Sequence, residues 1–179
     1  MKVLIVVDMQ NDFITGSLGS KDAQKIVGNV INKIKEYKDN GDKIIFTRDT
    51  HYDNYLETHE GEMLPIKHCI AGTEGWQIPD IIDRPECEHI NKPTFGWDLW
   101  RLVVADNGTV DTRQYTMDDI EIIGLCTDIC VISNALILRS IYPESNIVVD
   151  ASCCAGTSFE KHEAALEVMK SCQIEVINE

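Results

Sequence analysis

Short apolar runs alternate along this chain with longer stretches in which apolar residues recur every three or four positions. Lys2–Val7 forms an apolar run that ends at Asp8, which is typical of a central strand buried on both faces. Over residues 22–38 the apolar side chains share one helical face, and Asn40-Gly41 predicts the end of that helix. The alternation continues to the end of the chain and predicts an α/β fold with a mostly parallel sheet.

The remaining elements follow the same two patterns. Five further strands bring the predicted sheet to about six, at residues 43–47, 88–91, 120–125, 146–149 and 174–177. Helices are expected at residues 95–104, after Thr127, and from a capping box at Thr157 and Glu160 to about Cys172. With helices on both faces of the sheet, the chain is expected to form a three-layer, Rossmann-like sandwich in a single domain over residues 1–179.

Residues 119–138 hold the first candidate for chemistry. A buried strand ends at the turn Cys126-Thr127-Asp128, and helical apolar spacing resumes beyond it. With Thr127 as the predicted N-cap, Cys130 lies in the first helical turn, where N–H groups and the helix dipole favour a thiolate. The same pattern also fits a buried, unreactive cysteine. Cys130 is therefore a candidate nucleophile, with that alternative open.

Three predicted strand ends carry reactive groups. Asp8 follows the first strand, Lys92 follows the third, and the turn before Cys130 follows the fourth. Ligands of a parallel sheet bind at the carboxyl ends of its strands, so these three side chains would meet in one pocket. The lysine would then stabilise a thiolate and the aspartate would move its proton, as in covalent catalysis. An Asp–Lys ion pair beside an unrelated cysteine fits the same spacing.

A second group of side chains has the character of a metal site. Asp49 and His51 lie two residues apart at a strand end and therefore point to the same side. His68 comes from the long polar connection over residues 50–79, and the three together offer ligands suited to zinc, manganese or iron. The fourth ligand is open among three residues of that connection: Glu60, Glu57 and His59. Loop histidines that bind nothing fit the pattern as well.

Charge and cysteine content exclude several classes of partner. Sixteen basic residues against thirty acidic ones give a formal charge of −14, which disfavours nucleic acid and anionic membranes. The first apolar run reaches Asp8 too soon for a signal peptide or a membrane-spanning helix. Seven cysteines in no disulfide-like spacing indicate a reducing cytoplasm. A small neutral or cationic ligand, or a metal, is the expected partner.

Five motifs together resemble, in their order, those of the isochorismatase-like cysteine hydrolases. They are DMQNDF from Asp8, DTH from Asp49, HCIAGT from His68, KPTF from Lys92 and GLCTDICV from Gly124. The resemblance runs nearly end to end, and the second and third motifs match the nicotinamidase/pyrazinamidase branch, whose members bind a metal. The implied fold is the isochorismatase-like hydrolase fold.

Carried over residue by residue, the resemblance implies a mechanism. Cys130 attacks an amide carbonyl, Asp8 takes the thiol proton and passes it to the leaving ammonia, and Lys92 supports both. A cis peptide bond between Leu125 and Cys126 is also implied, with the N–H groups of Cys126 and Cys130 forming an oxyanion hole.

The resemblance further implies how a substrate would be held. A divalent metal, Zn²⁺ first and Mn²⁺ or Fe²⁺ as alternatives, would bind the pyridine nitrogen of nicotinamide. Its ligands would be Asp49, His51 and His68, with Glu60 preferred as the fourth. Phe13 and Phe95 would pack against the ring, and Leu64 lies in the stretch where such enzymes tend to have an aromatic residue.

The implied reaction is hydrolysis of nicotinamide to nicotinate and ammonia, and also of pyrazinamide, by a cytoplasmic homo-oligomer that serves NAD salvage. Two alternatives stay open. One is a related cysteine amidase or ureido-hydrolase that acts on another small amide. The other is a non-catalytic homologue that binds a small molecule.

Overall fold

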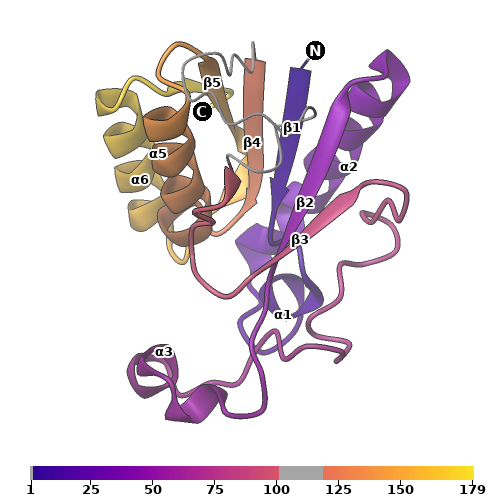
Figure 1. Ribbon diagram of the computed structural model, residues 1–179, viewed down its shortest axis with the longest axis vertical. Coiled ribbons are helices and arrows are strands. Elements are labelled where there is room, and N and C mark those ends of the chain that lie inside the picture. Colours follow the sequence, from indigo (N-terminus) through magenta and orange to yellow (C-terminus); the bar gives the residue numbers. More distant parts are fainter. Residues whose placement is uncertain (1, 101–118) are drawn as a thin grey trace.

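A six-stranded sheet forms the centre of the molecule (Figure 1), with the strand order β3-β2-β1-β4-β5-β6. The computed structural model describes residues 2–100 and 119–179. Its strands are β1 (Lys2–Val7), β2 (Lys43–Asp49), β3 (Glu88–Lys92), β4 (Asp119–Leu125), β5 (Asn146–Ala155) and β6 (Glu175–Ile177). Every neighbouring pair is parallel, so the predicted α/β class and strand number are confirmed.

Helices cover the sheet on both faces, which confirms the three-layer arrangement (Figure 1). The α-helices are α1 (Asn11–Ile14), α2 (Lys21–Asn40), α3 (His59–Met63), α5 (Ile132–Ile141) and α6 (Phe159–Ser171). A 3₁₀ turn at Tyr55–Glu57 precedes α3, and a π turn at Thr127–Val131 precedes α5. Among the described residues, none of these helices combines the length and the apolar character needed to cross a bilayer.

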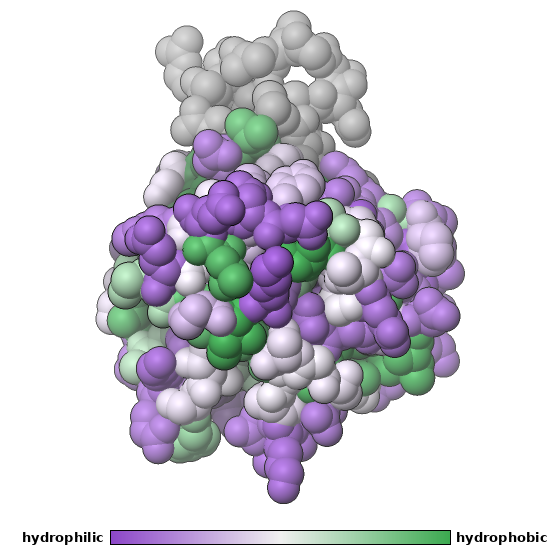
Figure 2. Space-filling model, turned by 90° about the horizontal axis from the view of Figure 1, so that it is seen from below, coloured by the Kyte–Doolittle hydropathy of each residue, from purple (hydrophilic) through white to green (hydrophobic). Residues whose placement is uncertain are grey.

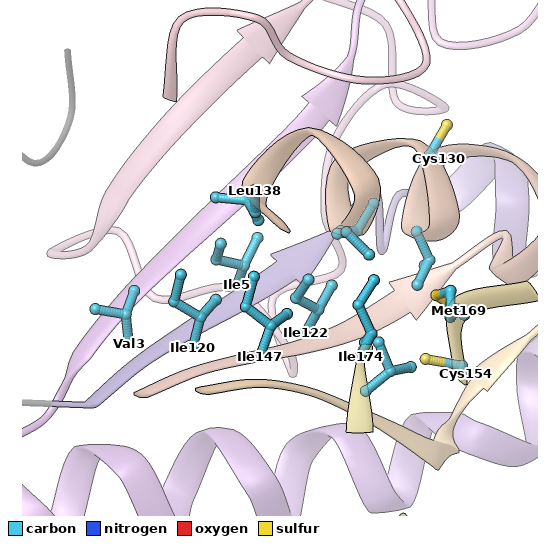
Figure 3. Close-up of a cluster of buried hydrophobic side chains, with 14 of the residues drawn as sticks. Val3, Ile5, Ile120, Ile122, Cys130, Leu138, Ile147, Cys154, Met169 and Ile174 are labelled. Atoms are coloured by element: carbon cyan, nitrogen blue, oxygen red, sulfur yellow. The ribbon is translucent and has the colours of Figure 1, made fainter. Parts of the chain in front are cut away.

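The side-chain alternation of β1 explains why it is buried on both faces. Val3 and Ile5 point into one apolar cluster with Leu138 of α5 and Met169 of α6, as Figure 3 shows. The intervening residues Leu4 and Val6 point the other way, into a second cluster formed with α2. The predicted central position of this strand is therefore confirmed.

Helix α2 follows the predicted pattern closely and extends it at both ends. Ser20 is the N-cap, and its side chain accepts a hydrogen bond of 3.0 Å from the Ala23 N–H. Gly41 ends the helix in the left-handed region at φ 72°, as Asn40-Gly41 predicted. Tyr37 lies on the buried face and donates to Glu121 of β4.

Both predicted threonine caps are wrong, because each threonine bonds to a different segment. Cys126, not Thr127, is the N-cap residue of the π turn, and the Thr127 Oγ1 lies 2.8 Å from the Nδ1 of His162 in α6. Ser158, not Thr157, caps α6. Long-range partners thus replaced the local hydrogen bonds that the capping rules assume.

Two further boundaries differ from prediction. Residues 95–99 form bends and a turn, so the helix expected from Phe95 is wrong there, and residues 101–104 lie outside the described part of the chain. Strand β5 continues past Asp150 to Ala155, since small and cysteine side chains at its end stay buried although the apolar run has stopped.

Candidate active site

The carboxyl ends of β1, β3 and β4, with β2 lying between β1 and β3, bring Asp8, Lys92 and Cys130 together. Asp8 directly follows β1 and Lys92 ends β3. The Lys92 Nζ lies 2.6 Å from the Asp8 Oδ2 and 3.5 Å from the Cys130 Sγ. Thr47 of β2 donates a 2.7 Å hydrogen bond to the other carboxylate oxygen of Asp8. We call Asp8, Lys92 and Cys130 the nucleophile group.

Burial sets the electrostatics of the nucleophile group. Asp8 and Lys92 are fully buried, and Cys130 is nearly so. Burial lowers the pKa of Lys92, but the negative charges of Asp8, Cys130 and Asp49 together raise it by more than burial lowers it. The ammonium therefore keeps its proton. Burial raises the pKa of Asp8, and Lys92 partly offsets that rise. The carboxylate of Asp8 is therefore a stronger base than an exposed aspartate.

The expected bias of Cys130 toward thiolate is wrong for this structure. Burial raises the pKa of the thiol well above its ordinary value, and the charge of Asp8 raises it again, while Lys92 lowers it less. The helix dipole argument fails because it ignores the loss of solvent around the sulfur. Cys130 therefore needs a base, and Asp8 is the carboxylate beside it.

The turn that carries Cys130 is fixed from the inside by Asn134. The peptide bond between Leu125 and Cys126 is cis, which confirms what the resemblance implied. The Asn134 Nδ2 donates 2.8 Å to the Cys130 carbonyl, and its Oδ1 accepts from the Trp100 Nε1 at 2.9 Å. Asn134 is fully buried. Sequence reasoning missed it, although a lone amide within an apolar helical stretch is a usable signal.

Asp128 anchors the same turn from the outside. Its Oδ1 accepts 2.7 Å from the Thr157 N–H, and its Oδ2 accepts 2.6 Å from the Thr157 hydroxyl. The neighbouring Gly156 packs so closely that an added Cβ would lie 2.9 Å from the Asp128 Oδ1. Asp128 was missed as well, because nothing in the sequence links it to a residue 29 positions away.

Four potential metal ligands form a second group, which we call the cation cluster. One ligand atom from each of Asp49, His51, Glu60 and His68 lies within 4.8 Å of all the others. The Asp49 Oδ2 lies 3.0 Å from the His51 Nε2 and 3.5 Å from the His68 Nε2. The Glu60 Oε1 lies 3.5 Å and 3.7 Å from the same two nitrogens.

The donor set fits a divalent cation. The Asp49 Oδ1 is buried and has no hydrogen-bond partner among the described residues. His68 places its Nδ1 2.9 Å from the Ile66 carbonyl, which leaves the Nε2 directed at the cluster, as in many metal-binding histidines. Burial lowers the pKa of His51, but Asp49 and Glu60 raise it to about 9. A field that holds a proton on His51 also attracts a metal ion.

The fold of the connection decides which acidic residue joins the cation cluster. Thr58 caps α3, its side chain accepting from the Gly61 N–H at 3.1 Å, and α3 turns Glu60 toward the two histidines. Glu57 and His59, the other candidates for fourth ligand, are not in the cluster.

Two polar residues at the start of α1 support the cation cluster: Gln10, its N-cap residue, and Asp12 within it. Gln10 is fully buried, and its side chain accepts from the Asp49 N–H at 2.7 Å and donates to the Asp49 carbonyl at 2.9 Å. The Asp12 Oδ2 accepts 2.7 Å from the Cys69 N–H, beside His68. Both belong to the motif DMQNDF, but the sequence alone indicates a role for neither.

The nucleophile group and the cation cluster open into one cavity of about 490 Å³. Cys126 and Cys130 line it on one side, and Asp49, Glu60 and His68 also line it. The three predicted ring contacts lie in its wall: Phe13, Leu64 and Phe95. The Phe13 ring lies 5.6 Å from the His68 ring, between centroids. A small molecule in this cavity would touch both groups at once.

Comparison of the sequence with known proteins identifies the family. The model of the Isochorismatase domain matches residues 2–179. The chain belongs to this family. Among its relatives, the nicotinamidase of Schizosaccharomyces pombe is 28% identical to this chain, over 98% of this chain and 92% of the relative's length. The nicotinamidase/pyrazinamidase of Mycobacterium tuberculosis is 27% identical over 99% of this chain and 98% of its own.

Solved structures agree with this assignment. The pyrazinamidase of Pyrococcus horikoshii in complex with zinc superposes with a TM-score of 0.80 at 29% identity, covering 99% of both chains. The nicotinamidase/pyrazinamidase of Bacillus subtilis gives a TM-score of 0.82 at 26% identity, again over 99% of both chains. The six-stranded sheet is thus that of an isochorismatase domain.

Proposed function

We propose that this chain hydrolyses nicotinamide to nicotinate and ammonia, and pyrazinamide likewise, through a thioester on Cys130. One observation carries the proposal: the buried thiol of Cys130, with Asp8 and Lys92 behind it, lines the same cavity as Asp49, Glu60 and His68 of the cation cluster. The similarity to nicotinamidases along nearly the full length of the chain supports the same substrate. An amide that also offers a ring nitrogen would use both groups.

The nucleophile group supplies the proton transfers. Asp8 takes the thiol proton as the Cys130 sulfur bonds to the amide carbon, and the proton then goes to the nitrogen that leaves as ammonia. Water next attacks the thioester, Asp8 takes a proton from it, and the carboxylic acid and the Cys130 thiol are released. Lys92 stays charged throughout and stabilises negative charge on the sulfur and on Asp8. The N–H groups of Cys126 and Cys130 are our candidates for the oxyanion hole.

The cation cluster would hold the metal by Asp49, His51, Glu60 and His68. Two nitrogen and two oxygen ligands suit Zn²⁺, which we favour over Mn²⁺ and Fe²⁺. When bound, the ion would coordinate the pyridine nitrogen and so fix the orientation of the ring. Phe13, Leu64 and Phe95 would pack around that ring. Self-association and a cytoplasmic location stay predictions from the sequence.

Ammonia release from a panel of amides tests the proposal. The panel is nicotinamide, pyrazinamide, benzamide and N-carbamoyl amino acids, with wild type, Cys130→Ala and the matched control Cys172→Ala, whose side chain lies outside the cavity wall. We expect release from the two ring-nitrogen amides only, and loss of at least about a thousandfold in kcat/KM for Cys130→Ala alone.

The other outcomes contradict the proposal in different ways. Preference for benzamide or a carbamoyl compound would indicate a related amidase or ureido-hydrolase. No release from any amide would indicate a non-catalytic binding protein. Substantial activity in Cys130→Ala would exclude the thioester.

A further inference from the structure

The cavity is too large for nicotinamide alone. Nicotinamide has nine non-hydrogen atoms, and even if each took the ~30 Å³ of a water molecule in the liquid, the molecule would fill only about 270 Å³. The cavity measures about 490 Å³, a size within the usual range for sites that enclose larger ligands. A bound nicotinamide would leave a substantial part of this space unfilled.

The wall of that space is mostly apolar and reaches the surface. Seven of its side chains are large and apolar: Phe13, Leu18, Met63, Leu64, Phe95, Leu125 and Ile129. Met63 is 76% exposed and Phe95 is 45% exposed, so large apolar side chains face solvent at the cavity wall. Figure 2 shows apolar surface between polar patches on the face seen from below, where α1 and α3 lie. Exposed apolar surface beside a cavity is typical of a site for an apolar group.

The charges of the wall exclude an anionic group. Its ionisable side chains other than the cysteines are Asp49, Glu60 and His68, all of the cation cluster, and within the described part of the chain no lysine or arginine lines the cavity. Lys92 is fully buried and paired with Asp8 at 2.6 Å. A carboxylate or phosphate placed in the apolar part of the cavity, away from the cation cluster, would therefore find no lysine or arginine to pair with.

Resting on the function proposed above, we propose that the site accepts pyridine-3-carboxamides with an uncharged apolar substituent at ring carbon 5. Carbon 2 lies between the ring nitrogen, which faces the cation cluster, and the carboxamide, which faces Cys130. Carbon 5 is diametrically opposite and points away from both anchors. A group at that position enters the remaining apolar space and leaves the reacting atoms where nicotinamide has them.

Steady-state kinetics with nicotinamide, 5-phenylnicotinamide and 5-carboxynicotinamide test this inference. We expect the phenyl compound to have a KM at least tenfold below that of nicotinamide with a similar kcat. The carboxylate should have a kcat/KM at least tenfold below that of nicotinamide. Leu18→Trp, which fills the space, should lower the phenyl-to-parent ratio of kcat/KM at least tenfold.

Two further variants separate filling of the cavity from general damage. Met63→Asp adds charge at an exposed position, where folding is not at risk, and should lower the same ratio. Val168→Trp is the matched control, because Val168 is exposed on α6 and lies outside the cavity wall, and the ratio should not change.

The outcomes distinguish this inference from the function on which it rests. If nicotinamide is hydrolysed and the phenyl compound is tenfold poorer, the inference is wrong and the function stands. The same holds if Leu18→Trp and Met63→Asp leave the ratio unchanged. If none of the three amides releases ammonia, the proposed function itself is wrong.

Discussion

The nucleophile group and the cation cluster lie side by side at the same edge of the sheet, but their buried charges are balanced in different ways. In the nucleophile group one carboxylate meets one ammonium at 2.6 Å, so the chain neutralises itself. The cation cluster joins two carboxylates to two histidines, and one oxygen of Asp49 has no hydrogen-bond partner among the described residues but lies 3.9 Å from the Lys92 Nζ of the first group. The first group is thus a paired carboxylate and ammonium, whereas the second is a set of four side chains that could ligate a metal ion.

The origin of the side chains differs in the same way. Asp8 and Lys92 come from rigid strand ends within the sheet. Glu60 comes from the five-residue helix α3, and His68 comes from the loop that follows it. The buried charge pair is thus built on the sheet, whereas the cation cluster combines Asp49 at the end of β2 with side chains of the connection. If the two groups act independently, a substitution in one group should leave the chemistry of the other unchanged.

The largest effect should follow from breaking the buried charge pair with Lys92→Met. Without the ammonium, the pKa of Asp8 rises further, because burial is no longer opposed, and a neutral Asp8 cannot take the thiol proton. We expect kcat/KM for nicotinamide to fall on the order of a thousandfold. The free energy of unfolding should fall by about 3–5 kcal/mol. Ammonia release and urea denaturation measure the two.

Lys170→Met is the matched control for that experiment, since Lys170 pairs with Glu167 at an exposed position on α6. It should change neither quantity. A Lys92→Met enzyme that keeps more than a tenth of its activity would show that the pair serves packing only.

A smaller loss should follow from opening the cation cluster with His51→Ala. The ring of the substrate would lose its anchor, and turnover of nicotinamide should fall roughly 100-fold, as for other ligand-shell changes. Alkylation of Cys130 by iodoacetamide should keep its rate within about threefold, because His51 does not touch the nucleophile group. Chelation of the wild type should have the same two effects, and Zn²⁺, Mn²⁺ or Fe²⁺ should restore turnover.

His89→Ala is the control, because His89 bonds to Asp83 and lies outside the cavity wall. If exhaustive chelation leaves nicotinamide turnover unchanged, the cation cluster is not needed for this reaction. If His51→Ala also abolishes alkylation, the two groups are not independent.

These two groups also mark how far the sequence could predict the structure. Strand and helix periods depend on local composition, so the order of elements and the strand ends that carry Asp8 and Lys92 were predictable. Glu60 was preferred over Glu57 as the fourth ligand, but spacing alone left both open, because the choice depends on where α3 starts. The pKa direction of Cys130 was wrong, because burial is set by segments distant in the sequence.

Two threonines show the same limit of prediction from local sequence. Thr127 and Thr157 each have the composition of a helix cap, and each bonds instead to a residue about thirty positions away. The capping rule considers only the cap residue and the three residues that follow it. The contact between Asp128 and Thr157 was therefore invisible before the fold was known, although it fixes the turn that carries Cys130.

That contact leads to a further prediction, for Asp128→Ala. The turn would lose both hydrogen bonds to Thr157, and small displacements of a nucleophile are costly. We expect kcat to fall about tenfold with KM nearly unchanged. Asp128→Asn should recover most of the loss, because its amide can accept from the Thr157 N–H and donate to the hydroxyl. A loss of melting temperature without a change in kcat would mean that the contact only stabilises the fold.

The smallest effect should be on the rate at which iodoacetamide alkylates Cys130, which reports the protonation of the thiol. Iodoacetamide reacts with the thiolate, and the pKa of Cys130 lies above that of a free cysteine, which is about 8.5. Alkylation at pH 8 should therefore be several-fold slower than that of free cysteine, with its midpoint at higher pH. Stability should follow the same sign: folding favours the neutral thiol, so its contribution is complete below about pH 8.5 and is lost as the pH rises toward the folded pKa.

Asp8→Asn should shift the pH profile of Cys130 alkylation to lower pH. Burial is the largest cause of the raised pKa, but the charge of Asp8 and its hydrogen bond to the thiol both add to it, whereas Lys92 lowers it. Without the carboxylate, Lys92 faces the sulfur alone, so the pKa of Cys130 should fall and alkylation at pH 8 should become several-fold faster. Turnover of nicotinamide should nevertheless collapse, because the thiolate then has no base to deliver a proton to ammonia. Slower alkylation in Asp8→Asn would mean that Asp8 organises the sulfur by geometry and not by charge, and the comparison with the cation cluster would lose its electrostatic basis.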